Sequence, residues 1–104
     1  MSQPELVFVS TGPDGAAELV VNFGVYSGRE ATPAEVERLA RALLEAVPAV
    51  EVVGEKRYEF SQDAEATVYR VRIFAPGAGA RAAELRATVA AWAEDCISER
   101  HVAP

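Results

Sequence analysis

The sequence predicts an α+β two-layer sandwich in which the order ββα occurs twice along the chain. Two helical patterns, at residues 32–47 and 82–100, each follow a pair of segments rich in β-branched and aromatic residues. Half of the 104 residues are hydrophobic, which suits one core in a single domain over residues 1–104. Two helices cover only one face of a four-stranded sheet, so we expect the other face to stay open.

The helix expected at residues 32–47 begins with three signals that agree. Thr32 is a favourable N-cap, and Glu35 three residues later completes a capping box. Pro33 occupies the first helical position, where its missing N–H costs no hydrogen bond. An apolar stripe then recurs at helical spacing: Val36, Leu39, Ala40, Leu43 and Val47. In the second helix the expected inward residues are Leu85, Val89, Trp92 and Cys96, and we expect Trp92 to lie between helix and sheet.

Four segments are expected to form strands, at residues 6–10, 18–27, 50–61 and 67–75. The second is partly apolar on both faces, which is typical of an inner strand. The third is rich in charge and has Gly54 near its middle, which indicates an edge strand with a bulge or bend. In the fourth, an inward apolar set alternates with an outward set: Tyr69, Val71 and Ile73 against Arg70, Arg72 and Phe74.

The order of these elements predicts the topology of the sheet. Moving the last strand of a βαββαβ ferredoxin-like fold to the front gives ββαββα. The antiparallel sheet then has the order 1-2-4-3, with both helices on one face. The two most apolar strands become central and the charged third strand takes an edge. Topology of this kind does not assign a function.

Composition narrows the classes of partner. The net charge is −6, and the longest basic run, Lys56-Arg57, is flanked by Glu55 and Glu59, so we expect no nucleic-acid partner. No apolar run approaches the ~20 residues that cross a bilayer, and the first residues do not resemble a signal peptide. A lone cysteine, Cys96, forms no intrachain disulfide. We therefore expect a cytoplasmic protein without a membrane partner.

A glycine-rich turn before the second helix contains a weak nucleotide-binding pattern. Gly77, Gly79 and Ala82 match the G-x-G-x-x-A spacing between a strand and a helix. The preceding strand carries arginines, however, and no strand follows the helix to complete a βαβ unit. We interpret the segment as a strand-to-helix turn, expect no cofactor, and retain Arg81 as a weak anion-binding candidate.

Acidic residues near the end of the second helix form a candidate metal or general-base site. Asp95 and Glu99 share a helical face, and His101 follows closely. A solvated acidic face with a terminal histidine is the simpler interpretation, so we expect no tightly bound metal. Cys96 shares the apolar stripe with Trp92, which predicts a small buried hydrophobic residue rather than a nucleophile.

The leading functional hypothesis is a small non-enzymatic interaction or regulatory module that forms a homodimer through the open sheet face. The residues expected at that interface are Val20, Tyr26, Val53, Arg70, Arg72 and Phe74. The alternative is a small-molecule-binding protein or small enzyme with a pocket between sheet and helices or at the dimer interface. In that case the polar groups would come from the tyrosines and from the cluster near the end of the second helix, with Arg81 as a further ligand-binding residue: Tyr26, Tyr58, Tyr69, Asp95, Glu99 and His101. The third hypothesis is that the chain is the dedicated partner of another protein, such as an acidic inhibitor of a basic target.

Overall fold

A computed structural model of the chain describes residues 5–102 and the side chains of residues 5–98. The elements are β1 (Val7–Thr11), the 3-10 turn η1 (Pro13–Gly15), β2 (Ala17–Val21), α1 (Phe23–Ser27), α2 (Pro33–Leu43), β3 (Glu51–Phe60), β4 (Glu65–Ala75), the 3-10 turn η2 (Gly79–Arg81) and α3 (Ala82–Val102). The four strands form one antiparallel sheet in the order β1-β2-β4-β3. The predicted fold class and strand order are therefore confirmed.

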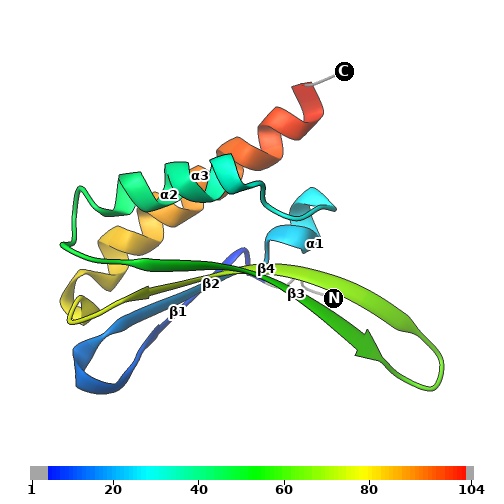
Figure 1. The fold of residues 1–104 in the computed structure, drawn as a ribbon, viewed down its shortest axis with the longest axis horizontal. Helices are drawn as coiled ribbons and strands as arrows, with labels where there is room; N and C mark the ends of the chain where they lie inside the picture. The colour runs from blue at the N-terminus through cyan, green and yellow to red at the C-terminus, as the bar shows by residue number, and fades with distance from the viewer. Residues whose placement is uncertain (1–4, 103–104) are drawn as a thin grey trace.

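The helices all lie on one side of the sheet, as Figure 1 shows, and leave its other face open. β2 pairs with β4 only along residues 71–75, whereas β3 pairs with β4 along residues 65–74. Residues 56–69 therefore form a two-stranded hairpin, called the arm below. The arm extends past the helix layer and curves towards the open side of the sheet (Figure 1).

The core lies between the sheet and the helices as one cluster of buried side chains. Its larger members are Leu19, Phe23, Leu39, Leu43, Ile73, Leu85, Val89 and Trp92. Trp92 stacks obliquely on Phe23 of α1, with ring centroids 5.5 Å apart, and its indole N–H donates a 2.9 Å hydrogen bond to the carbonyl of Glu35 in α2. The buried position predicted for Trp92 is confirmed, and the residue joins all three helices.

The prediction of one strand over residues 18–27 is wrong beyond Val21. Asn22 leaves the extended conformation (φ −81°, ψ 59°), and the chain forms α1 instead. The Asn22 amide nitrogen donates to the carbonyl of Glu5, and its oxygen accepts from Nε of Arg70. These two contacts hold the end of β2 while Phe23 turns into the core. Tyr26 consequently lies in α1, on the helix side. The prediction that it lies on the open face is wrong.

The predicted capping box is present at the start of α2. The Thr32 hydroxyl accepts from the amide of Glu35 at 3.2 Å, and the Glu35 carboxylate accepts from the amide of Thr32 at 2.9 Å. The helix ends at Leu43 rather than at Val47, which remains buried in the turn that follows. The register of β3 on β4 runs through Gly54 without a bulge. No helix within residues 5–102 is long and apolar enough to cross a membrane.

Candidate interaction surface on the open sheet face

The strand register arranges the open face into rows that cross the sheet. In one row Phe74 of β4 lies in register between Glu18 of β2 and Glu51 of β3; we call it the acidic–aromatic row. In the next row Arg72 is flanked by apolar residues, and this arginine row comprises Phe8, Val20, Arg72 and Val53. Neighbouring strands are ~4.8 Å apart, so each central side chain lies within reach of its flanking pair.

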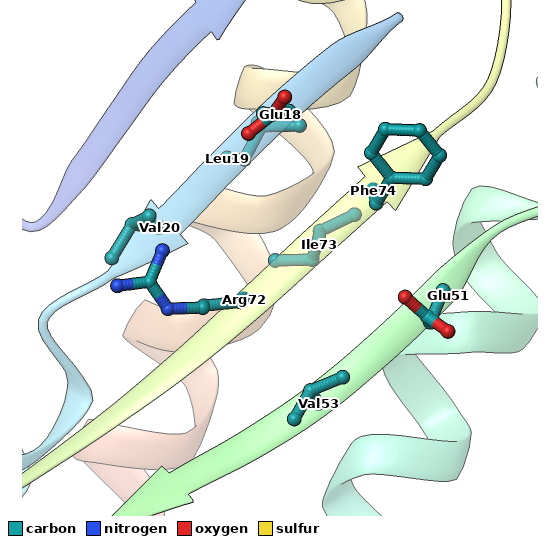
Figure 2. Close-up of a pocket in the computed structure, with 8 residues that line it drawn as sticks. All are labelled: Glu18, Leu19, Val20, Glu51, Val53, Arg72, Ile73 and Phe74. Atoms are coloured by element: carbon teal, nitrogen blue, oxygen red, sulfur yellow. The ribbon is translucent and has the colours of Figure 1, made fainter. Parts of the chain in front are cut away.

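The two rows surround a shallow hollow on the surface. It has a volume of about 210 Å³, and its side-chain walls are Glu18, Val20, Glu51, Val53, Arg72 and Phe74. Figure 2 shows these side chains in front of the sheet, with the helices behind it. Phe8, Val53 and Phe74 are 47%, 45% and 38% exposed. The open face thus presents apolar groups to solvent beside charges of both signs.

Arg72 is held in place from the arm side of the hollow. Its Nε is 2.9 Å from Oε2 of Glu55, a residue one row further towards the arm. The other carboxylate oxygen of Glu55, Oε1, is buried and has no hydrogen-bond partner among the described residues. The guanidinium end of Arg72 lies towards Val20 (Figure 2). Its Nη1 and Nη2 groups carry further N–H donors, which suit a carboxylate.

The side chains of this face are of kinds that recognise a cation and apolar groups. An aromatic ring between two carboxylates recognises a cation by its charge and by contact with the ring face. The hollow contains neither a histidine nor a cysteine or serine nucleophile within its lining. Its side chains are therefore suited to hold a cationic group and apolar groups of a partner.

Five of the six predicted interface residues come together on this face: Val20, Val53, Arg70, Arg72 and Phe74. The sixth, Tyr26, does not, because α1 carries it to the helix side. The prediction missed Phe8, Glu18 and Glu51. Alternation along each strand predicts that these residues share a face with every second neighbour. Which residues lie beside them on the next strand depends on the register of the strands, and that register brings them into these rows.

The tyrosines and Arg81 proposed for a ligand pocket belong to three separate parts of the fold: α1 (Tyr26), the arm (Tyr58 and Tyr69) and η2 (Arg81). Tyr58 and Tyr69 lie near each other on the arm, with Nζ of Lys56 5.4 Å and 5.8 Å from their ring centroids. A hydrogen bond with Tyr58 raises the pKa of Lys56 above its usual value. Arg81 is the last residue of η2, directly before α3, and its Nη1 donates a 2.8 Å hydrogen bond to the carbonyl of Ala46. That contact ties η2 to the end of the α2 segment.

The glycines of the G-x-G-x-x-A pattern have structural roles. Gly77 has φ +67°, a conformation that glycine adopts without strain. A Cβ on Gly79 would come within 2.7 Å of the carbonyl oxygen of Gly15, so this glycine lets η2 approach η1 closely. These contacts explain both glycines without a bound phosphate.

The predicted metal cluster is only partly described. Asp95 is exposed on α3 beside Trp92 and Arg38, along a groove of about 350 Å³, while the side chains of Glu99 and His101 lie outside the described residues. No three His, Cys, Asp or Glu side chains in the described part of the chain are grouped to hold a metal ion. Cys96 is fully buried, as predicted, and burial raises the pKa of its thiol to about 11. A thiol in that state is a poor nucleophile at neutral pH.

The chain matches no protein-family model, no curated protein and no solved structure. Any functional inference therefore depends on the geometry of the chain's own surface.

Proposed function

We propose that this protein is a non-enzymatic interaction module that forms a homodimer through the open face of its sheet. The observation that carries the proposal is the joint exposure of Phe8, Val53 and Phe74 on a face that no helix of the described chain covers. A contiguous apolar patch rimmed by charge is typical of a contact surface. The other face of the same sheet shows that the fold buries such residues where a layer is available.

A second copy of the chain suits this face because the face carries both signs of charge. In a two-fold dimer the same patch occurs on both sides, so each group must meet a complementary group from an identical surface. Glu18 and Glu51 provide negative charge in one row, and Arg72 provides positive charge in the next. A dedicated basic partner would leave Arg72 facing a like charge. The self-complementary patch therefore favours a homodimer over the basic partner.

The size of the face sets the strength of the dimer. Four strands at ~4.8 Å spacing and five residues at ~3.3 Å each cover a flat area of roughly 320 Å². Stable interfaces bury about 800 Å² of accessible surface on each partner, and projecting side chains raise the flat value only in part. We therefore expect a dissociation constant in the micromolar range unless the arm adds contacts.

A small-molecule pocket between sheet and helices has less support. One continuous cluster of buried apolar side chains fills that layer. The tyrosines that would supply its polarity lie on the arm and in α1, outside that cluster.

The proposal is tested by measuring mass against concentration. We expect light scattering or sedimentation from about 1 to about 500 µM to show a monomer that becomes a dimer. Phe74→Asp and Val53→Asp should remain monomeric throughout that range. Leu44→Asp is the matched control, because Leu44 is similarly exposed (48%) but follows α2 on the helix side. A wild-type monomer at every concentration, or a dimer that survives both aspartates, would overturn the proposal.

A further inference from the structure

The row pattern restricts how two open faces are able to stack. Two identical sheets that meet face to face are related by a two-fold axis lying in the plane between them. An axis parallel to the strands places each row against the same row of the partner. The acidic–aromatic row, with Glu18 and Glu51, would then face itself and bring carboxylates together. Like charges in contact disfavour that arrangement.

An axis perpendicular to the strands exchanges the rows, and its position decides which rows meet. An axis passing through Arg72 places the two Arg72 side chains opposite each other, and one passing through Phe74 again pairs acidic rows. An axis between these two residues places the arginine row over the acidic–aromatic row in both directions. Of these arrangements, only the last pairs opposite charges without facing any row against itself. Like the other axes considered, it keeps the strands of the two sheets aligned, as in aligned sheet packing.

We propose that in the dimer Arg72 of each protomer enters the hollow of its partner, over the ring of Phe74 and between the carboxylates of Glu18 and Glu51. This inference rests on the proposed dimer and specifies its register. The partner side of the contact has an aromatic face for the guanidinium plane and two carboxylates for its N–H groups. Arg72 is accessible for this role, with 46% of its side chain exposed.

Glu55 acts as a positioning residue for this contact. Its Oε2 accepts a hydrogen bond from Nε of Arg72, which holds the side chain before association and leaves the Nη1 and Nη2 groups for the partner's carboxylates. Each arm then extends past the end of the partner's sheet. Because the arm curves towards the open side (Figure 1), it adds contact area that the four-stranded part alone lacks.

A charge-exchange experiment tests the register. Arg72→Glu places a third carboxylate against the hollow, and the double substitution Glu18→Arg, Glu51→Arg places three cations together. We expect each variant alone to dimerise at least about tenfold more weakly than wild type. A mixture of the two restores opposite charges at both contacts. We expect a heterodimer with an affinity within about threefold of wild type.

The controls separate this inference from the proposed dimer. Arg86→Glu makes the same charge change on α3, where the side chain is 55% exposed, and should leave dimerisation unchanged. Circular dichroism and thermal unfolding verify that each variant folds. If Arg72→Glu does not fold, Arg72→Gln replaces it as the variant that removes the positive charge. A dimer that tolerates both charge variants, or a mixture that fails to recover, overturns the register while the dimer stands. A wild-type monomer overturns both.

Discussion

The two faces of β4 differ although they belong to the same eleven residues. Val71, Ile73 and Ala75 point to the helices and are at most 2% exposed, whereas Phe74 is 38% exposed on the open side. The rows on the helix face that contain Val71 and Ile73 are apolar, so burial there stabilises the fold without distinguishing one row from the next. On the open face successive rows differ in charge. The helix face therefore contributes to stability, and in the proposed dimer the open face is the one that specifies the contact.

The largest effect on the helix side is expected at Trp92. Trp92→Ala removes the contact with Phe23 and the hydrogen bond to the carbonyl of Glu35. We expect a loss of about 3–5 kcal/mol in the free energy of unfolding, measured with urea at a concentration where the protein is monomeric. Val25→Ala is the control, because Val25 is 54% exposed in α1. A loss below about 1 kcal/mol for Trp92→Ala would contradict its central place in the core.

The comparison of the two faces is sharpest at two neighbours on β4. Ile73→Ala should lower the free energy of unfolding by about 2–5 kcal/mol, because the side chain is fully buried. Phe74→Ala should cost less than about 1 kcal/mol in the monomer, because solvent already reaches the ring. The effect on dimerisation should be the reverse, with Phe74→Ala the more harmful. Equal costs in urea unfolding would remove the distinction between the faces.

On the helix side, the ion pair between Arg29 and Glu35 makes a pH-dependent contribution to the free energy of unfolding. Two hydrogen bonds from Arg29, at 2.8 Å and 2.7 Å, lower the pKa of Glu35 from 4.5 to about 2. Because the folded pKa is the lower one, this stabilisation is present above pH ~4.5 and is lost as pH falls towards 2. Glu35→Gln should cost about 1–3 kcal/mol near neutral pH, and the difference from wild type should shrink below pH ~4.5 and be lost as the pH falls through about 2. A difference that is constant with pH would contradict the ion pair.

Sequence patterns over a few residues predicted the features that depend on contacts between neighbours in the chain. The capping box at Thr32 needs only residues three apart, and it is present as expected. The end of β2 was not predictable in this way, because the alternation of Val21, Phe23 and Val25 continues through the point where the strand stops. Tertiary contacts stop it: Asn22 bonds to distant groups, and Phe23 packs on Trp92. The long-range partner decides between strand and helix there.

The open face was predictable in composition but not in arrangement. Alternation along β4 placed Arg70, Arg72 and Phe74 on one side, as the structure shows. The position of Glu18 and Glu51 on either side of Phe74 depends on the register of three strands, which the loop lengths alone did not define. The hollow is a property of that register.

The smallest change in stability is expected for a substitution of Glu55. This residue distinguishes most directly between an effect on the fold and an effect on the dimer contact. The ion pair with Arg72 joins side chains that are 27% and 46% exposed, and pairs of this kind contribute about 0.2–1 kcal/mol. Glu55→Gln should therefore lower the free energy of unfolding of the monomer by less than about 1 kcal/mol. Gln retains an oxygen that accepts from Nε of Arg72, but the bond loses its charge.

The same substitution should weaken the dimer several-fold, because a less firmly held Arg72 enters the partner's hollow at a greater cost in side-chain entropy. Sedimentation at several concentrations measures the change in dimer affinity. Urea unfolding of the dilute protein measures the change in the stability of the monomer. Glu59→Gln, further along the arm on the same strand face, is the matched control and should change neither. If Glu55→Gln lowers stability and leaves dimerisation intact, Glu55 serves the fold rather than the contact, and the open face does not act through a positioned Arg72.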